Sequence, residues 1–456
     1  MAHDLTTGKT GRVLLKFTLP LFISVVFQQF YSIADSMLAG RFAGEDALAA
    51  VGASYPITNL FNAVAFGCNI GCGIVISQCF GAKDYKRVKT AVSTALISGL
   101  VLGGVLTLLG VVFSPQLLQM INTPENIFAD STSYLAIYTG GFVFLFIYNV
   151  TNGIFTSLGD SRTSLYFLIF SSVTNVALDY VAVKYMNMGV RGVAWATFVS
   201  QGIACVLSVI TMLRHMKRLK TDERASLYSF ELLKKFVVYS VPSVLQQSFV
   251  SVGNVFIQKL INSFGSSVVA GFSAAMKLNM FTVNCLYTFG NAVSAFTGQN
   301  VGAGKYHRIK EGMKYGSIMS IVAGCLFAGI YLGFSDSLIR AFLDSDGSVG
   351  AVTSGTAFLM TVTPFYCFIG VKLVGDGILR GVGAMRLFVV VTFADLITRV
   401  VLAFVFAPIW GYQGIWYSWP IGWCLATVLS MIFYVSLIKK YKNHNHQLNW
   451  WFAQAL

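Results

Sequence analysis

Twelve long apolar stretches constrain this chain more than any other feature of its sequence. Each is long enough to cross about 30 Å of hydrocarbon as a helix, at about 1.5 Å per residue. A membrane-spanning strand barrel would instead show alternating segments of about ten residues. The stretches occupy residues 14–40, 54–79, 90–113, 132–158, 164–184, 190–213, 236–263, 268–299, 313–334, 350–379, 387–408 and 413–438. The sequence therefore predicts an all-α polytopic membrane protein with twelve transmembrane helices.

The second half of the chain repeats the first. Residues 81–89 (GAKDYKRVK) follow the second apolar stretch, and residues 302–310 (GAGKYHRIK) follow the eighth. The two copies lie 221 positions apart and share five of nine residues. This duplication predicts two pseudo-symmetric lobes of six helices each. We expect an N-lobe over 1–213, a cytoplasmic linker over 214–235 and a C-lobe over 236–456.

Basic residues are distributed unevenly between the two sides of the predicted membrane. If the N-terminus is inside, 24 of the 32 Lys and Arg residues, Arg380 among them, face the cytoplasm, and five lie outside. This positive-inside asymmetry is typical of polytopic membrane proteins, so the net charge of +14 requires no nucleic-acid partner. We expect a multi-pass protein of the bacterial inner (plasma) membrane, with both termini in the cytoplasm.

Several ionisable residues nevertheless fall deep inside the apolar stretches. Because an intramembrane charge is costly, each such residue is a candidate functional residue. In the C-lobe, the acids have bases four residues away, since Lys372 precedes Asp376 and Asp395 precedes Arg399. Residues four apart share a helix face, so each acid can meet a base on its own helix. For these pairs we weigh a structural or gating role.

The acids of the N-lobe have no such base on their own helices. Asp35 and Asp179 have only uncharged residues four positions away, and no acid occupies the corresponding C-lobe positions. Two carboxylates in a pocket of low dielectric cannot both stay charged cheaply, so one should hold a proton or both should share a cation. Asn175 and Thr197 lie at a similar depth, and their oxygens suit Na⁺ or H⁺ equally well. Asn149 and Asn152 share a face of the fourth helix and can point into the same pocket.

These features resemble the multidrug and toxic compound extrusion (MATE) transporters. The resemblance rests on the twelve-helix two-lobe plan, the repeated motif, residues 153–162 (GIFTSLGDSR) and residues 379–381 (LRG), and it extends from Pro20 to about Leu437. Within the family, the chain resembles the branch related to the DNA-damage-inducible protein F (the DinF-like branch), which carries a cation site in its N-lobe. The matching residues are Tyr31, Asp35, Asn149, Asn152, Asn175, Asp179 and Thr197. The norfloxacin-exporter branch adds acids on helices 7 and 10. Here helix 7 offers Gln246 and Gln247 instead.

The resemblance implies a cation-coupled antiporter that exports amphipathic, cationic drugs or metabolites by alternating access. Its coupling ion would be H⁺ or Na⁺, and Na⁺ would bind at the N-lobe residues Asp35, Asn175, Asp179 and Thr197. We expect a monomer in the bilayer, with a small-molecule substrate and no cofactor.

A flippase or exporter of an anionic or lipid-linked substrate is the alternative, because Lys277, Lys372 and Arg399 make the C-lobe basic inside. Lys277, Gln246 and Gln247 are candidate substrate contacts. The sequence offers no nucleophile, metal set or phosphate-binding loop typical of an enzyme, and no repeated filter typical of a channel.

Overall fold

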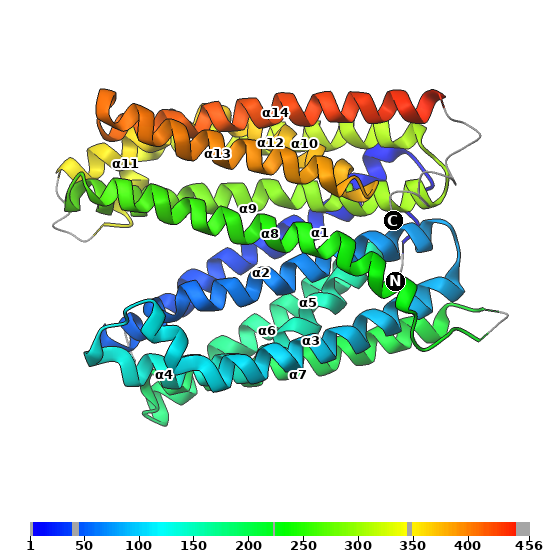
Figure 1. Ribbon diagram of the computed structural model, residues 1–456, viewed down its shortest axis with the longest axis horizontal. Coiled ribbons are helices and arrows are strands. Elements are labelled where there is room, and N and C mark those ends of the chain that lie inside the picture. Colours follow the sequence, from blue (N-terminus) through cyan, green and yellow to red (C-terminus); the bar gives the residue numbers. More distant parts are fainter. Residues whose placement is uncertain (1–2, 39–44, 222–223, 344–348, 444–456) are drawn as a thin grey trace. The chain divides into compact units, whose positions relative to one another are not determined.

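The computed structural model describes residues 3–38, 45–221, 224–343 and 349–443, and this part of the chain contains helices and no strands. The side chains of residues 33–38, 45–48 and 441–443 lie outside this description. Asp35 is therefore placed only by its backbone, in helix α1. The helices of the first half are α1 (Thr10–Leu38), α2 (Glu45–Gly81), α3 (Tyr85–Met120), α4 (Glu125–Gly140), α5 (Phe142–Ser157), α6 (Ser161–Tyr180), the short π-helix η2 (Val181–Tyr185) and α7 (Gly189–Arg218) (Figure 1).

The second half repeats this order of elements. It contains α8 (Phe230–Asn262), α9 (Ser266–Gly302), α10 (His307–Arg340), α11 (Val349–Val362), the 3₁₀ turn η3 (Thr363–Phe365), α12 (Tyr366–Gly381), α13 (Met385–Trp410) and α14 (Tyr412–Asn443). The pair α4 and α5 corresponds to one predicted stretch, and α11 and α12 correspond to another. Each half therefore has the six rods that the sequence predicts, which confirms the predicted fold class.

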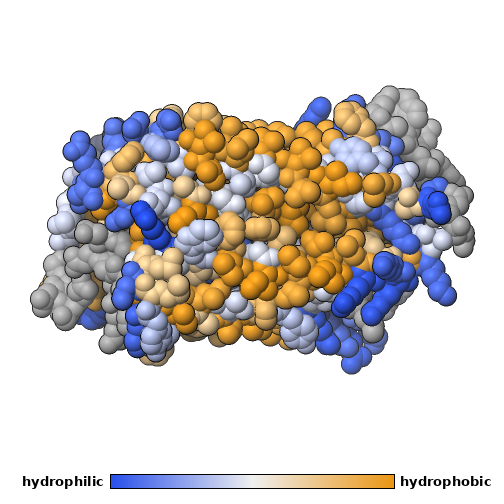
Figure 2. Space-filling model, turned by 90° about the horizontal axis from the view of Figure 1, so that it is seen from below, coloured by the Kyte–Doolittle hydropathy of each residue, from blue (hydrophilic) through white to orange (hydrophobic). Residues whose placement is uncertain are grey.

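The lengths and compositions of the helices suit a bilayer. Within the described residues, nine spans are long and apolar enough to cross a membrane, and the pair α4 and α5, bent by 45°, makes a tenth. The other two rods are α8 and α9. On the face drawn in Figure 2, apolar residues gather over the middle of the helices and hydrophilic residues lie toward their ends. Apolar side chains such as Leu108 and Val101 on α3 are each 64% exposed.

The chain divides into two compact units, and two helices pass from one to the other. Unit 1 contains residues 1–4 and 19–244, and unit 2 contains residues 5–18 and 245–456. Helix α1 thus begins in unit 2 and ends in unit 1, whereas α8 begins in unit 1 and ends in unit 2. These boundaries differ from the lobe limits expected from the sequence, because the start of α1 and the start of α8 each join the unit formed mainly by the other repeat.

Glycines allow close helix packing within each unit. In unit 1, a Cβ atom on Gly71 of α2 would lie 2.1 Å from Ser240 Oγ and 2.7 Å from the Ser240 backbone nitrogen on α8. One turn earlier, a Cβ atom on Gly67 would lie 2.3 Å from a methyl group of Val244. In unit 2, a Cβ atom on Gly377 of α12 would lie 2.2 Å from the carbonyl oxygen of Gly290 on α9. Small residues at such positions let membrane helices approach backbone to backbone.

Candidate functional site

Unit 1 contains a buried polar cluster on α6, facing α1 and α7. Asn175 and Asp179 lie one turn apart on α6 and are 2% and 3% exposed. The Tyr31 hydroxyl of α1 is hydrogen-bonded to the Asn175 side-chain amide. The structure thus brings together three of the residues that the sequence predicts for the N-lobe pocket.

The orientation of the Asn175 amide decides how the cluster is connected. When its NH₂ group faces Tyr31, the same group donates to Asp179 Oδ2 at 3.3 Å, and the amide oxygen accepts from the backbone nitrogen of Thr197 at 3.2 Å. This orientation satisfies both ends of the amide, whereas the reverse one places oxygen against acceptors. Asn175 therefore links α1, α6 and α7 around an acidic side chain.

The remaining predicted N-lobe residues take different places. The Thr197 hydroxyl donates to Val193 O at 3.1 Å within its own helix. The Thr197 hydroxyl oxygen can therefore interact with other groups only as an acceptor, through its lone pairs. Asn149 of α5 likewise donates to Leu145 O at 2.9 Å. Among the described residues, the buried Oδ1 of Asn152 has no hydrogen-bond partner. The side chain of Asp35 lies outside the described residues, so its contact with the cluster stays a prediction.

Unit 2 contains a second buried group of charges on α12 and α13. Lys372 Nζ lies 2.8 Å from Asp376 Oδ2, and both residues are almost fully buried. Arg380 stands one further turn along α12 and is 1% exposed. Its Nη1 donates to the Tyr287 hydroxyl at 2.8 Å, while its Nε and Nη2 have no partner among the described residues. The sequence predicts Arg380 in a segment that faces the cytoplasm, whereas the structure buries it within α12. Residues 372, 376 and 380 are four positions apart, and this spacing indicates that all three lie on one face of α12.

Asp395 and Arg399 of α13 do not form the contact expected from their spacing. The Arg399 guanidinium lies 4.3 Å from the centre of the Trp419 ring on α14. In the part of the chain that the structure describes, neither Asp395 nor Arg399 is in an ion pair. A guanidinium over an aromatic face is stabilised by the ring quadrupole, and more so away from water. A Cβ atom on Gly422 of α14 would lie 2.8 Å from Asp395 Oδ1, so only glycine lets α14 approach this acid.

The three candidate substrate contacts lie on α8 and α9. Lys277 of α9 is exposed, and its Nζ lies 5.7 Å from the centre of the Phe342 ring. Gln246 is buried, and its Oε1 has no partner among the described residues, whereas Gln247 is half-buried. Among the described residues, no hydrogen bond or ion pair joins these three side chains, and their role stays a prediction.

The chain matches a known family over both repeats. The model of the family described as MatE matches residues 20–181 and 242–405. A solved structure described as the outward-facing conformation of a multidrug resistance MATE family transporter of the MOP superfamily superimposes with a TM-score of 0.90 at 21% identity. The match covers 97% of this chain and 99% of that one, which establishes the shared fold.

Two bacterial proteins with assigned names are similar in sequence to this chain. The "Probable multidrug resistance protein YpnP" of Bacillus subtilis (strain 168) is 29% identical over 439 residues, covering 95% of this chain and 96% of that protein. The "FAD transporter" of Shewanella oneidensis is 24% identical over 320 residues, covering 68% of this chain and 70% of that protein.

Proposed function

Because the chain belongs to the MatE family of multidrug efflux transporters, we propose that it is an antiporter that exports amphipathic, cationic small molecules in exchange for H⁺ or Na⁺. The coupling ion would bind in unit 1 at Asp35, Asn175, Asp179 and Thr197, supported by Tyr31, Asn149 and Asn152. The observation that carries the proposal is the buried Asn175 amide, which connects Asp179 to Tyr31 and to the Thr197 backbone.

This arrangement supports ion binding for a physical reason. A carboxylate buried to this degree is stabilised by donated hydrogen bonds, by a proton or by a cation. The amide supplies a donor without adding charge, so the cluster keeps its affinity for one positive ion. Asp35 would add a second carboxylate. Two buried carboxylates repel each other when both are charged, so sharing a proton or Na⁺ would lower the free energy of the pair.

Antiport then needs only differential binding. The ion favours one conformation of the protein and the exported molecule favours the other, so each drives the release of its competitor. In transporters built from repeats, the repeats move against each other around a central site. Here α1 contributes Tyr31 to the proposed ion site in unit 1, and the same helix begins in unit 2. Ion binding on α1 would therefore act on a helix that belongs to both units.

We further propose that the protein resides in the inner membrane of a bacterium, with both termini in the cytoplasm. The relatives named above are bacterial, and in the predicted topology most basic residues lie on the same side as the termini. The linker over 214–235 would then lie at the cytoplasmic face.

An anionic or lipid-linked substrate is the second candidate. Its support is the buried group in unit 2, where Lys372, Arg380 and Arg399 outnumber Asp376 and Asp395 by one charge. One relative is named an FAD transporter, and FAD is an anion with a pyrophosphate. A buried arginine with unpartnered N–H groups is well suited to bind phosphate or carboxylate oxygens.

Transport by purified protein in proteoliposomes tests both candidates. Ethidium would serve as the cationic probe and FAD as the anionic probe, each with an imposed H⁺ or Na⁺ gradient. We expect ethidium flux that depends on one of the gradients. Flux of FAD alone would replace the first candidate with the second, and absence of gradient-dependent flux of any probe would contradict coupled export.

A further inference from the structure

The two copies of the repeated motif hold two different partners. In unit 2, Arg308 Nη1 donates to Gly8 O and Lys305 Nζ donates to Thr6 O, both at 2.8 Å. The carbonyl oxygen of Leu5 accepts from Asn300 at 3.4 Å. Lys305 and Arg308 therefore both donate to backbone oxygens of the segment that precedes α1.

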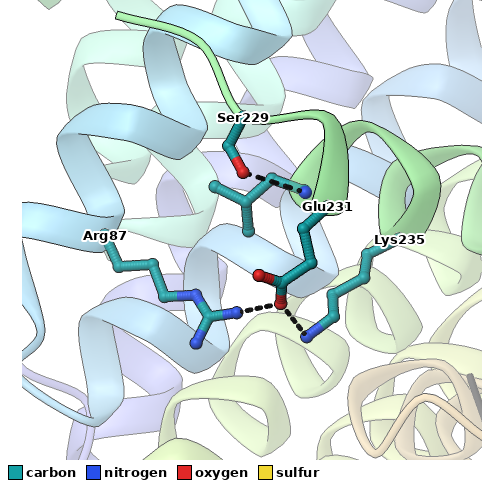
Figure 3. Close-up of polar contacts among 5 residues, drawn as sticks. Arg87, Ser229, Glu231 and Lys235 are labelled. Atoms are coloured by element: carbon teal, nitrogen blue, oxygen red, sulfur yellow. Dashed lines mark hydrogen bonds and ion pairs between the residues drawn. The ribbon is translucent and has the colours of Figure 1, made fainter. Parts of the chain in front are cut away.

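In unit 1, the same motif meets the start of α8 itself, and the contacts differ. Arg87, which corresponds to Arg308, forms an ion pair with Glu231, and Lys235 approaches the same Glu231 oxygen at 3.1 Å (Figure 3). Asp84 stands where unit 2 has Lys305. A carboxylate cannot donate to a carbonyl oxygen, and Asp84 instead accepts from the backbone nitrogen of Arg87 at 2.9 Å.

The segment before α8 is instead fixed further along α3. The Ser229 nitrogen donates to Thr94 Oγ1 at 3.0 Å, and the Tyr228 hydroxyl lies 3.2 Å from Ser98 Oγ. This leaves a cavity of about 330 Å³ between the segment and α3, with Asp84 and Leu232 on its wall. Its other lining residues are Lys86, Arg87, Thr90, Ser226, Tyr228 and Ser229.

The charge of this cavity favours an anion. Lys86 and Arg87 line it, against one acid, Asp84. Glu231, which pairs with Arg87, is also in contact with Lys235, so cations outnumber acids by three to two among these described residues. The hydrogen bond from Lys235 and the nearby Arg87 guanidinium lower the pKa of Glu231, so this acid stays ionised and compensates only part of the positive charge. The hydroxyl groups of the lining residues Ser226 and Ser229 add short donors that suit phosphate oxygens, whereas the Thr90 hydroxyl donates to Lys86 O.

Apolar side chains beside the cavity point to a lipid. Leu227 and Phe230, which are chain neighbours of the lining residues Ser226 and Ser229, are each 75% exposed. Exposed apolar side chains next to basic residues are typical of segments that lie at the membrane interface, where cations meet anionic headgroups. A free phosphate ion would give these apolar side chains no partner, whereas a phospholipid supplies both a phosphate and acyl chains.

We propose that this cavity, the headgroup pocket, binds the phosphate of an anionic phospholipid in the leaflet next to the linker. The bound headgroup would tie the segment before α8 to α3. The proposal depends on neither the exported molecule nor the coupling ion.

Native mass spectrometry of the purified full-length protein in detergent tests this inference with phosphatidylglycerol and phosphatidylcholine as probes. We expect the wild type to retain one phosphatidylglycerol more tightly than phosphatidylcholine. Lys86→Glu should weaken that binding about fivefold or more, because each basic residue near a membrane surface contributes about 1 kcal/mol to the attraction of anionic lipid. Lys310→Glu makes the same charge change on the exposed face of the second motif copy and should leave the bound lipid in place.

A second variant separates loss of binding from loss of folding. Ser226→Phe fills the pocket from an exposed position, so it should exclude the lipid while the protein stays monodisperse and helical. Titration with inorganic phosphate distinguishes the two sources of the anion. Binding of inorganic phosphate without preference for phosphatidylglycerol, or equal lipid binding by the wild type and both pocket variants, would overturn the proposal.

Discussion

At the residue scale, the candidate ion site depends on one uncharged side chain. Asn175 holds Asp179 through its NH₂ group and reaches the Thr197 backbone through its oxygen. A hydrogen bond to a charged group is worth about 1.5–3 kcal/mol, more than one between neutral groups. The geometry of Asp179 should therefore depend on this amide.

Replacing Asn175 by alanine should lower the initial rate of gradient-driven flux about tenfold or more, because about 1.4 kcal/mol corresponds to a factor of ten. Flux of a fluorescent substrate into proteoliposomes measures the rate. Asn262→Ala is the matched control, since Asn262 is exposed and bonds only its helix neighbour Gln258 among the described residues. Equal rates for Asn175→Ala and the wild type would remove the amide from the site.

The Lys372–Asp376 ion pair should show strong coupling between its partners. Removing one residue leaves a buried charge unpaired and typically costs about 3–5 kcal/mol, whereas removing both should cost much less. A double-mutant cycle of thermal unfolding with alanine variants measures this. The exposed pair Asp336 and Arg340 has the same spacing and should couple by less than about 1 kcal/mol. Additive effects at Lys372 and Asp376 would contradict the buried pair.

Residue spacing predicted some of these contacts and not others. Positions 372 and 376 share a face and do meet. The same spacing at 395 and 399 gives no ion pair, because Arg399 lies over Trp419, which belongs to the next helix. Spacing within one helix carries no information about an aromatic ring that packing brings in from another. The acids of the N-lobe were identifiable because they lack a base nearby in sequence, but the connections of Asn175 required the packing of three helices.

At the scale of elements, the starts of α1 and α8 differ from the rest of these helices in the unit to which they belong. Each belongs to the unit built mainly from the other repeat, and each is held there by a copy of the repeated motif. Within unit 1, the first half of α8 lies against α2 at Gly67 and Gly71. The close approach of these backbones should resist any added side-chain atom.

Gly71→Ala should lower the free energy of unfolding by about 1–3 kcal/mol, because the new methyl group would meet Ser240 backbone and side-chain atoms that cannot move independently of α8. Thermal unfolding in detergent provides the measurement. Gly104→Ala on α3 is the matched control, since a Cβ atom there has nothing within 4 Å and should change stability by about 0.5 kcal/mol or less. The two variants unfolding at the same temperature would be inconsistent with this packing.

The contact of Glu231 with Lys235 and Arg87 should make stability depend on pH in acid. Both cations lower the pKa of Glu231 below its ordinary value of 4.5, so the contact stabilises the fold above that pH and loses this effect as the pH falls through the folded pKa. Between about pH 5 and pH 3, the wild type should lose more stability than Glu231→Gln. The difference should not exceed about 1 kcal/mol, because the group is solvent exposed. Parallel unfolding curves for the two proteins would refute this contribution.

The elements themselves followed largely from the apolar pattern, and their irregularities did not. The predicted stretch 132–158 appears as α4 and α5, with a bend of 45° at Gly141. A Cβ atom on Gly141 would lie 2.9 Å from the Phe198 ring of α7, so the break is fixed by a helix 57 positions later in the chain. Hydropathy measures how apolar a segment is. It contains no information about where a neighbouring helix packs against that segment.

At the scale of the whole molecule, the duplication is structural and the chemistry is not duplicated. Both halves fold into six rods and both match the MatE family model. The first half connects a buried acid to the uncharged amide of Asn175, whereas the second half has three buried bases beside its acids. We infer that unit 1 supplies ion coupling and that unit 2 contributes a charged interior with a different role.

The most direct test of ion coupling in unit 1 is gradient-driven transport by Asp179→Asn in proteoliposomes. The variant keeps the size of the side chain and removes the charge, so it should abolish flux driven by H⁺ or Na⁺ while retaining equilibrium binding of the same substrate. Asp336→Asn, at an exposed acid of α10, should transport like the wild type. Gradient-driven flux by Asp179→Asn at the wild-type rate would contradict coupling through this site.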